Sequence, residues 1–315
     1  MTSTVAERWA RARSFHHSAF PAARIAAART DTVSVCLPAR ECAHTIGEIV
    51  AVCCALRDDG LLDEIVVVDA ASADGTAAVA ERAGATVLQE SELCPEYGPV
   101  LGKGDAMWRA LGELRGDVVC FLDADIVDFR AHYVSGILGP IVCEPAVSFV
   151  KAFYRRPFRH AGVSIPDGGG RVNHLMARPA LAMFYPELAG VRQPLAGEMA
   201  ARRELLHRIP WTTGYGVETA MLIDVWREVG LDEMAQVDLD SHQNANQSVH
   251  ALSSMAYTVL EVIAGRLERE GRLRGFDPAP LLGADGPQSV ALAERPPLAS
   301  LRAAAGSAPA SRARS

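Results

Sequence analysis

Short apolar runs alternate with stretches of helical periodicity over the first half of the chain. The apolar runs are rich in Val, Ile and Cys and predict strands at residues 32–38, 64–70, 85–89 and 117–122. Apolar residues that recur every three or four positions predict helices at residues 45–56, 74–83 and 103–114, with Asp74 as a helix N-cap. Such a pattern is typical of a parallel sheet covered on both faces. We therefore expect an α/β fold with a mostly parallel, twisted sheet and helices on both sides.

The second half of the chain is less regular. Its pattern predicts strands at residues 148–154 and 233–239, and helices at residues 173–185, 197–209, 215–229 and 248–270. From about residue 277 onward Pro, Ala, Gly, Ser and Arg dominate, and we expect the last fifteen residues or so to be disordered.

Composition and charge exclude several classes of protein. The 315 residues carry 31 basic and 38 acidic side chains, a net charge of −7, which gives no general attraction to nucleic acid or anionic lipid. No apolar run reaches the roughly 20 residues that span a bilayer, and the Arg- and Ala-rich N-terminus lacks the apolar segment of a secretion signal. Seven cysteines without C-x-x-C spacing indicate a reduced, cytoplasmic protein.

The sequence Asp123-Ala124-Asp125 follows the strand predicted at residues 117–122. Two carboxylates at a strand end can ligate a hard divalent cation, which in turn can neutralise a diphosphate. An aspartate that caps the next helix is the alternative interpretation.

Two other strand ends belong to the same predicted crevice, because ligands of parallel sheets lie beyond the carboxyl ends of the strands. Asp69 ends the second strand, where an acidic residue often accepts hydrogen bonds from a ribose or a base; a turn-capping aspartate is the alternative. Pro38-Ala39-Arg40-Glu41 ends the first strand in place of a G-x-G-x-x-G turn. Dinucleotide binding is therefore disfavoured, whereas nucleotide binding by another arrangement is not.

Two predicted helices are preceded by glycines that have a basic residue next to them in the sequence. Gly102-Lys103-Gly104 carries one of only two lysines in the chain, and Gly168-Gly169-Gly170-Arg171 carries an arginine. Backbone amides at a helix start and a nearby cation can bind phosphate or carboxylate. A plain turn is the alternative for the second segment. The other lysine, Lys151, lies in an aromatic and basic stretch that faces either an acidic substrate or solvent at a sheet edge.

Two further residues are candidates of lower specificity. His242 follows the last predicted strand; a lone histidine is more often structural than a metal ligand, but the carboxylate motif adds weight to it. Glu218 is either an active-site carboxylate or the first-turn acid that favours a helix N-terminus.

The segments VVVDAASADGT, GKGDAMWRAL, FLDADI, VKAFYRRP, GGGRV, QPLAGE and GYGVE, followed by the histidine, occur in an order that resembles the glucosyl-3-phosphoglycerate synthases. These are retaining glycosyltransferases of the GT-A fold, with mannosyl-3-phosphoglycerate synthases as near relatives. The resemblance runs from about residue 32 to residue 297. It implies transfer of glucose from UDP-glucose to 3-phosphoglycerate, with Mg2+ or Mn2+ as cofactor and a homodimer as the assembly.

The resemblance also implies roles for individual residues. Asp125 and His242 would ligate the metal, and Glu218, Tyr215, Asp123 and Lys103 would act in catalysis. Residues that would bind the sugar nucleotide are Pro38, Ala39, Arg40, Glu41, Asp69, Ala70, Lys103, Asp123, Ala124 and Asp125. Residues that would bind the acceptor are Gly169, Gly170, Arg171, Val172, Asn173 and Asn244. Residues 31–145 would form the nucleotide-sugar half and 146–276 the acceptor half, between an N-terminal extension at 1–30 and a Pro- and Ala-rich tail at 277–315.

Several departures from the family pattern leave alternatives open. Arg40-Glu41-Cys42 ends the first strand, and the approach to the histidine, Asp238-Leu239-Asp240-Ser241, is acidic where relatives are basic. GDP-mannose as donor or a different phosphorylated or carboxylated acceptor is one alternative. A catalytically inactive protein that binds sugar nucleotides is another, and a nucleotidyltransferase is a weaker one. The helix predicted at 248–270 is either a dimer interface or part of the core.

Overall fold

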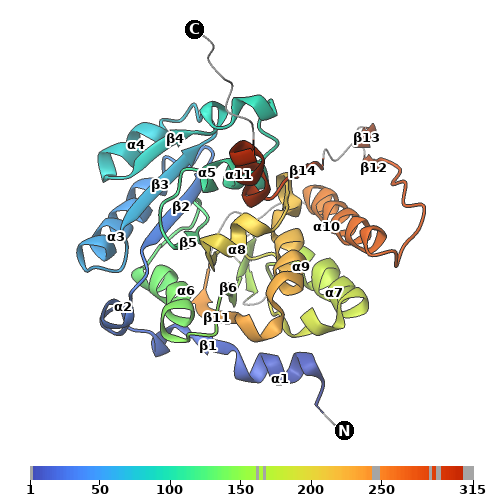
Figure 1. Cartoon of the computed structure of the whole chain (residues 1–315), viewed down its shortest axis with the longest axis horizontal. Helices are drawn as coiled ribbons and strands as arrows, with labels where there is room; N and C mark the ends of the chain where they lie inside the picture. Colours follow the sequence, from blue (N-terminus) through green and yellow to red (C-terminus); the bar gives the residue numbers. More distant parts are fainter. Residues whose placement is uncertain are drawn as a thin grey trace.

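A central sheet of eight strands organises the computed structural model, which describes residues 3–160, 163–165, 168–242, 249–283, 286–288 and 292–307 (Figure 1). In spatial order the strands are β1 (Ser14–His16), β11 (Met234–Ser241), β6 (Phe149–Arg155), β9 (Met199–Arg202), β5 (Val118–Phe121), β2 (Val33–Ala39), β3 (Glu64–Asp69) and β4 (Thr86–Gln89). Neighbours are parallel except at β9, which runs antiparallel to both β5 and β6. The predicted mostly parallel sheet is confirmed.

Both faces of the sheet are buried, which is why its strands are continuously apolar. Along β2, Val35 and Leu37 pack into one core, whereas Cys36 between them packs into the other. The helices over the first core are α2 (Ala22–Ala28), α3 (Ile46–Asp58), α4 (Thr76–Ala83) and α6 (Ala131–Cys143). The helices over the second core are α5 (Lys103–Leu111), α7 (Arg178–Phe184), α8 (Arg203–Arg208), α9 (Val217–Val229) and α10 (Val249–Arg269).

The N-terminal segment, expected only as an Arg- and Ala-rich extension, contributes to the sheet. Helix α1 (Val5–Ala12) leads into β1, which pairs in parallel with β11 as an edge strand. The indole of Trp9 is buried and donates a hydrogen bond to the carbonyl of Met234 at 2.9 Å. Three residues are too few for a recognisable strand pattern, so only this packing identifies β1.

The prediction of a helix over residues 197–209 is wrong in its first part. Met199–Arg202 forms β9, inserted between β5 and β6, and only Arg203–Arg208 is helical. Met199, Ala200 and Ala201 are completely buried, and so short an apolar run does not distinguish a buried strand from a buried helix. Helix α6 is an addition to the predicted elements. The prediction of Asp74 as the N-cap of α4 is wrong by one residue, because Gly75 is the N-cap; the Asp74 carboxylate still accepts a hydrogen bond from the Thr76 amide at 3.0 Å.

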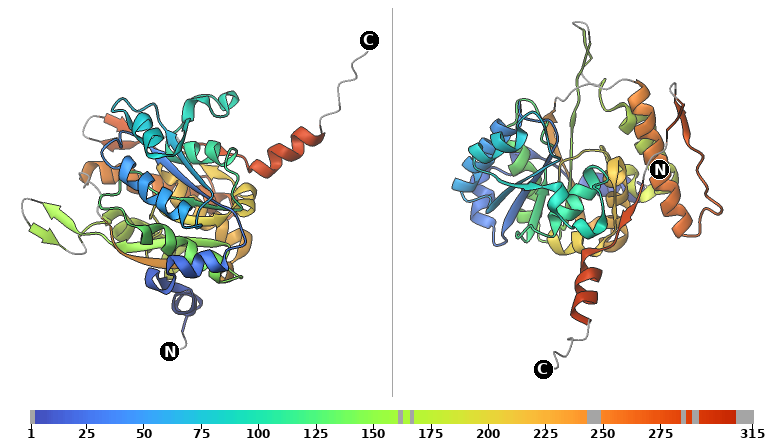
Figure 2. Two further views of the ribbon diagram at one scale, coloured as in Figure 1. Left: turned by 90° about the vertical axis from the view of Figure 1, so that its left-hand side faces the viewer. Right: turned by 90° about the horizontal axis from the view of Figure 1, so that it is seen from above.

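The C-terminal part returns to the body of the molecule after α10. The short strands β12 (Leu281–Gly283) and β13 (Gly286–Gln288) pair with each other, and β14 (Glu294–Arg295) pairs with β10 (Trp211–Thr212). Helix α11 (Leu298–Ser307) covers part of the stretch that was expected to be disordered, and the rest of that stretch lies outside the described residues. The hairpin of β7 (Phe158–His160) and β8 (Val163–Ile165) and helix α11 both project from the body (Figure 2).

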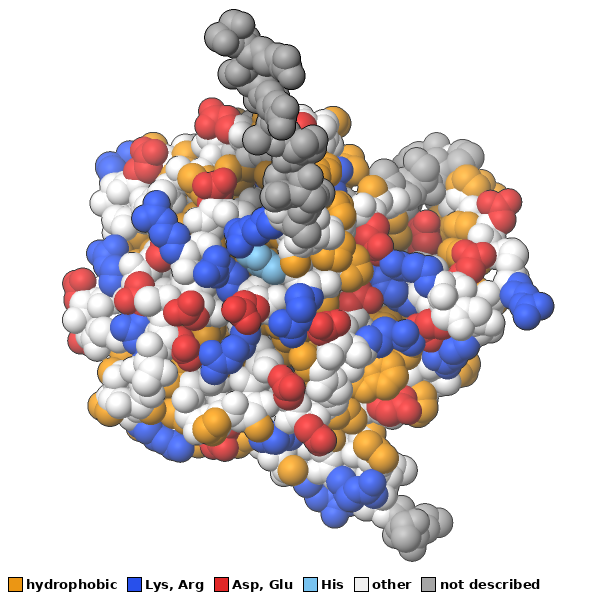
Figure 3. Space-filling view, in the orientation of Figure 1, with side chains coloured by type: hydrophobic (Ala, Val, Ile, Leu, Met, Phe, Trp, Pro, Cys, Tyr) orange, Lys and Arg blue, Asp and Glu red, His pale blue; other side chains and the backbone are white. Residues whose placement is uncertain are grey.

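Surface charge agrees with the small net charge of the chain. On the face shown in Figure 3, basic and acidic side chains are interspersed among uncharged ones. Among the described helices, none is both long and apolar enough to cross a bilayer.

Candidate active site

A cavity of about 620 Å³ opens at the carboxyl ends of the parallel strands. It brings together segments that are far apart in the sequence: the ends of β2, β3 and β5, the start of α5, the glycine loop and the start of α9. The sequence-predicted residues that line it are Pro38, Ala39, Arg40, Ala70, Lys103, Asp123, Ala124, Asp125, Gly169, Gly170, Arg171, Val172, Asn173, Tyr215, Glu218 and His242.

Two of the predicted residues, Asp69 and Glu41, do not line the cavity. Asp69 is buried at the end of β3; one carboxylate oxygen accepts from the Ser72 amide at 3.1 Å, and the other has no partner among the described residues. Glu41 joins the ends of β2 and β3, because its carboxylate accepts from the Ala73 amide at 2.9 Å. Asn244 lies outside the described residues.

Lys103 connects two carboxylates at the floor of the cavity. Its ammonium group donates to Asp123 at 2.6 Å and to Glu218 at 2.9 Å. Burial alone would lower the pKa of Lys103, but these two carboxylates raise it well above the ordinary value. Burial would likewise raise the pKa of Asp123, but the Lys103 ammonium holds it below the ordinary value. Lys103 and Asp123 are therefore both charged, and the same ammonium group also donates to Glu218.

Two glycines allow this close packing. A Cβ atom on Gly104 would lie 2.1 Å from the Thr212 carbonyl oxygen, so only glycine lets α5 approach β10. A Cβ atom on Gly197 would lie 2.3 Å from the carboxylate oxygens of Asp123. The motifs GKG and QPLAGE thus contain glycines that make room for the charged groups.

A buried ion-pair network holds the segment that precedes Lys103. The carboxylate of Asp105 accepts from the guanidinium of Arg295 at 2.8 and 2.7 Å and from that of Arg109 at 3.2 Å. It also accepts from the Leu101 amide at 2.9 Å. Because Arg295 belongs to β14, the C-terminal part of the chain helps to fix the start of α5.

Asp125 and His242 provide the donor set that a divalent cation needs. The side chain of His242 is completely buried, and neither ring nitrogen has a hydrogen-bond partner among the described residues. Burial and the nearby Arg156 guanidinium lower the pKa of His242 to about 4, so the imidazole is neutral and can act as a ligand. Desolvation in the cleft and the Asp123 carboxylate raise the pKa of Asp125. An orphaned neutral imidazole next to clustered carboxylates fits a metal site.

Glu198 and Tyr154 are part of the site, although the sequence analysis assigned no role to either. The Glu198 carboxylate is fully buried; it accepts from the Tyr154 hydroxyl at 2.8 Å and lies 3.9 Å from Nδ1 of His242. Burial and the nearby Asp123 raise the pKa of Glu198 to about 7. The ring of Tyr154 meets the ring of His242 edge-on at 4.4 Å. The signal in the sequence that could have identified them is the pair of family motifs that contain them, QPLAGE for Glu198 and VKAFYRRP for Tyr154.

The glycine loop forms the opposite wall of the cavity. Gly170 has a φ of 65°, and the helical segment that follows begins at Arg171 and includes a π-helix over Asn173–Ala177. The amide of Gly169 donates to the Arg156 carbonyl at 2.9 Å, which ties the loop to the end of β6. Asn173 uses its side-chain amide within the protein, because its oxygen accepts from the Leu195 amide at 3.3 Å.

Lys151 is buried behind the cavity and does not line it. The residue is 2% exposed, and its ammonium group has no hydrogen-bond partner among the described residues. Burial lowers the pKa of Lys151 to about 8 despite the nearby carboxylates of Glu218 and Glu198. Lys151 thus faces neither solvent nor the cavity, so both predicted alternatives for this lysine are wrong.

The fold and the site together define a glycosyltransferase of the GT-A class. Residues 34–161, which carry β2 to β7, match the model of the family described as "Glycosyl transferase family 2".

Longer matches identify the family more narrowly. The chain is 41% identical over 267 residues to a glucosyl-3-phosphoglycerate synthase of Petrotoga mobilis, covering 83% of this chain and 82% of that protein. It is 40% identical to the glucosyl-3-phosphoglycerate synthase of Mycolicibacterium smegmatis, and this match covers 94% of this chain and 98% of that protein. The chain belongs to the glucosyl-3-phosphoglycerate synthase family.

Two solved structures are similar over nearly the whole chain. The mannosyl-3-phosphoglycerate synthase of Rubrobacter xylanophilus has a TM-score of 0.85 and 45% sequence identity, covering 95% of this chain and 98% of its own. A glucosyl-3-phosphoglycerate synthase of Mycobacterium tuberculosis, in complex with Mn2+, UDP-glucose and phosphoglyceric acid, has a TM-score of 0.79 and 36% identity, covering 92% and 99%. Both synthases thus have the fold of this chain.

Proposed function

We propose that this protein is a metal-dependent retaining glycosyltransferase that transfers glucose from UDP-glucose to 3-phosphoglycerate. The observation that carries the proposal is the shared cavity: Lys103, Asp123 and Glu218 form its charged floor, and Asp125 and His242 are available beside them. Relatives named glucosyl-3-phosphoglycerate synthase match the chain over most of its length.

The donor is proposed to occupy the wall formed by the ends of β2, β3 and β5. Pro38, Ala39, Arg40 and Ala70 are placed there to contact the nucleoside, with the orphaned carboxylate oxygen of Asp69 just behind them. A buried acceptor without a partner is the kind of group that binds a ribose hydroxyl or a base amide.

Asp125 and His242 would hold the divalent cation. When it is bound, the ion neutralises the charge of the nucleotide diphosphate and so makes it a better leaving group. Mn2+ is present in the complex of the Mycobacterium tuberculosis enzyme, and we propose that Mg2+ serves this chain as well. The fully buried His242 is held by aromatic contacts with Tyr154 and Tyr133, which fix the plane of its ring.

The acceptor is proposed to occupy the wall formed by the glycine loop. The amides at the start of the helical segment and the Arg171 guanidinium suit a phosphate or a carboxylate, and Arg156 lines the same cavity. Gly169, Gly170 and Val172 bring the backbone close to the acceptor. Asn244 remains a proposed acceptor ligand that lies outside the described residues. This division makes residues 31–145 the donor half and 146–276 the acceptor half.

For the transfer itself, the charged floor holds the reacting sugar. Asp123 and Glu218 are proposed to face the anomeric carbon as it becomes positive, and Lys103, which donates to both carboxylates, fixes their positions. Tyr215, partly exposed at the start of α9, is placed to contact the sugar. Glu218 is the nearest candidate for a nucleophile, but its bond to Lys103 weakens it in that role. We favour a same-face displacement in which the departing phosphate takes the proton of the acceptor hydroxyl.

A second candidate function is transfer of mannose from GDP-mannose to the same acceptor. It is favoured by the 45% identity with the mannosyl-3-phosphoglycerate synthase of Rubrobacter xylanophilus, which exceeds the 36% identity with the Mycobacterium tuberculosis glucosyl enzyme. The glucosyl activity has the support of curated relatives that cover more than nine-tenths of the chain.

A donor and acceptor matrix tests the proposal. The purified protein is incubated with Mn2+ and either UDP-glucose or GDP-mannose, each with 3-phosphoglycerate or with glycerol 3-phosphate, and the released nucleoside diphosphate and the glycoside are measured. We expect the fastest turnover with UDP-glucose and 3-phosphoglycerate, and an α-linked product. Faster turnover with GDP-mannose would favour the second candidate. Binding of UDP without turnover in any combination would contradict both.

The proposal includes the assembly and the compartment. A homodimer is proposed, and light scattering coupled to size-exclusion chromatography measures its mass. A reducing, cytoplasmic location is supported by the seven cysteines, all of which are free, because cysteines of proteins in oxidising compartments are commonly joined in disulfides. A monomer in solution would contradict the proposed homodimer.

A further inference from the structure

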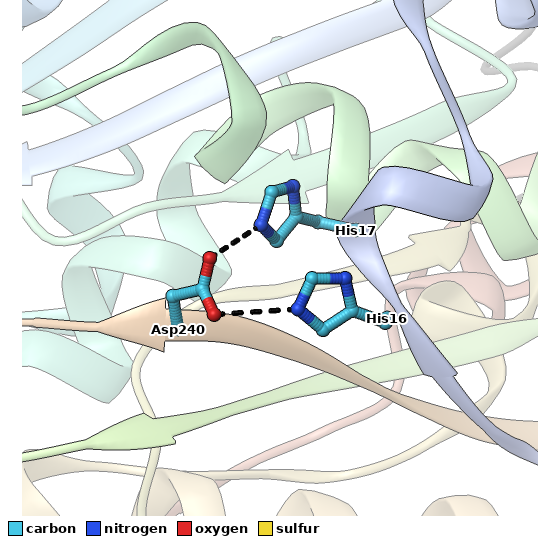
Figure 4. Close-up of side chains that lie close together, drawn as sticks. All are labelled: His16, His17 and Asp240. Carbon is cyan, nitrogen blue, oxygen red and sulfur yellow. Dashed lines mark hydrogen bonds and ion pairs between the residues drawn. The ribbon is translucent and has the colours of Figure 1, made fainter.

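Two histidines from the N-terminal segment and one aspartate from β11 converge outside the cavity (Figure 4). Nε2 of His16 lies 3.3 Å from one carboxylate oxygen of Asp240, and Nε2 of His17 lies 2.7 Å from the other. All three ligand atoms lie within 4.8 Å of one another. No other group of three such side chains is as close within the described ranges.

We propose that His16, His17 and Asp240 form a second metal site, separate from the catalytic one, that takes Zn2+ or a similar borderline transition-metal ion. Two imidazoles and one carboxylate suit such ions, whereas Mg2+ prefers sites built from oxygen ligands. Three protein ligands leave a position for water, as in open zinc sites.

The distances and the exposure fit this assignment. Two ligands bound at roughly 2.0–2.1 Å to one tetrahedral Zn2+ lie about 3.3 Å apart, which matches the separation of His16 and Asp240. His17 makes its direct hydrogen bond of 2.7 Å to the other carboxylate oxygen, so the ring or the carboxylate has to shift for one oxygen to share the ion with both imidazoles. The side chains of His16 and Asp240 are 47% and 50% exposed, so an ion can enter from solvent.

Neighbouring groups orient the histidines as ligands. Nδ1 of His16 lies 2.7 Å from the Ser18 hydroxyl, and a hydroxyl can both donate and accept, so this contact suits the ring in either tautomer. The ring of His17 is only 18% exposed and lies against the ring of His132, with centroids 4.3 Å apart. His132 is held in turn by its contact with the Leu239 carbonyl at 3.3 Å. Such outer contacts fix ring orientation and raise metal affinity.

The site would clamp the N-terminal segment to the sheet. β1 pairs with β11 through only three residues, of which His16 is the last, and the chain leads away from the sheet at His17. Asp240 stands at the point where the pairing of β11 with β6 loses register, with a φ of 68°, and lies two residues before His242. An ion that binds only the folded form stabilises it by mass action, so Zn2+ should raise the melting temperature.

Calorimetry with Zn2+ and no nucleotide tests the proposal in the full-length protein. We expect one equivalent to bind to the wild type and equally to Asp125→Ala, which lacks the proposed catalytic ligand. His17→Ala and Asp240→Asn should each weaken binding by more than the roughly 10- to 100-fold loss that follows removal of an outer-shell partner. His44→Ala, which removes an exposed histidine elsewhere, is the matched control and should bind like the wild type.

Co2+ absorption and thermal melting provide independent measurements. Co2+ should give the visible bands of a low-coordinate nitrogen and oxygen site in the wild type and in Asp125→Ala, but not in His17→Ala. Zn2+ should raise the melting temperature of the same two proteins only. Undiminished Zn2+ binding by His17→Ala, or a thiolate charge-transfer band that places the ion on a cysteine, would overturn the proposal. Absence of binding to the wild type would do the same.

Discussion

The two walls of the cavity are built in different ways. The proposed donor wall consists of the carboxyl ends of β2, β3 and β5, three neighbouring parallel strands whose ends meet because of the sheet itself. The proposed acceptor wall consists of the glycine loop and the helical segment that follows it, which includes a π-helix. Tertiary contacts place these parts, such as the bond from the Gly169 amide to the Arg156 carbonyl. A regular sheet thus determines one wall, and individual contacts determine the other.

This difference suggests how the enzyme separates its tasks. A donor wall fixed by the sheet is rigid, and its side chains need only extend a short way from the strand ends. An acceptor wall built on glycines can be altered by single substitutions without disturbing the sheet. Residues at the junction, above all Lys103, act on both sides and should be the least replaceable.

Lys103→Ala should cause the largest loss of activity, because the variant leaves Asp123 and Glu218 as adjacent, uncompensated carboxylates. We expect kcat to fall by about 10³-fold, in line with the removal of one preorganised electrostatic group. Steady-state kinetics with UDP-glucose and 3-phosphoglycerate measure the effect, and the melting temperature shows that the fold persists. Lys103→Arg should not restore activity, because the larger guanidinium does not fit the same point between two carboxylates. Full activity in either variant would contradict the assigned floor.

Lys151 affects stability and gives a pH prediction. Its pKa is about 8 in the folded protein against an ordinary value of 10.5, so the unfolded state binds the proton more tightly and stability rises with pH between these values. The difference corresponds to about 3 kcal/mol. Lys151→Met should therefore be more stable than the wild type near pH 7, and the gain should shrink as the pH rises from 8 toward 10.5. Urea unfolding at several pH values measures this. A pH-independent difference would contradict the buried, unpartnered ammonium.

Asp125→Ala should remove metal-dependent binding of UDP from the donor wall. We expect about a 10²-fold loss in kcat/KM, and UDP affinity that no longer responds to Mn2+. Calorimetry with UDP, with and without Mn2+, separates this from a general loss of nucleotide binding. Glu41→Ala is a useful comparison, because its carboxylate joins two loops and does not line the cavity. UDP binding that stays metal-dependent in Asp125→Ala would reject the ligand assignment.

Arg171→Ala should affect the acceptor wall alone and have the smallest effect on activity. We expect the KM for 3-phosphoglycerate to rise by about tenfold, because the variant loses one charge-assisted hydrogen bond to the acceptor. The KM for UDP-glucose should stay unchanged. Arg178→Ala removes an exposed arginine from the same helical segment and is the matched control. An equal rise in both KM values would mean that the two walls are not separable.

Most of the sheet and most of the cavity could be predicted from local patterns. Continuous apolar runs identified β2, β3, β5 and β6, because strands buried on both faces have few polar positions. The motif Asp123-Ala124-Asp125 and the glycine segment were visible because special chemistry or backbone geometry needs unusual residues at short spacing.

Other features depend on contacts between distant segments, and no local pattern encodes them. β1 and β9 are too short to be recognised and exist as strands because neighbouring strands accept their hydrogen bonds. The Asp105 network includes Arg295, 190 residues away. Glu198 belongs to the recognised motif QPLAGE, but the motif does not indicate that this carboxylate lies beside Tyr154 and His242.

The sequence by itself determined the class of fold, the edge of the sheet where ligands bind and the family to which the chain belongs, because these follow from periodicity and short motifs. Only the tertiary structure decided which charges meet. It brought Lys103 between Asp123 and Glu218, buried Lys151 with no hydrogen-bond partner in the described part of the chain, and set two N-terminal histidines against Asp240. The physical reason is that hydrophobic patterning acts over a few residues, whereas electrostatic pairing depends on the distances that the whole fold creates.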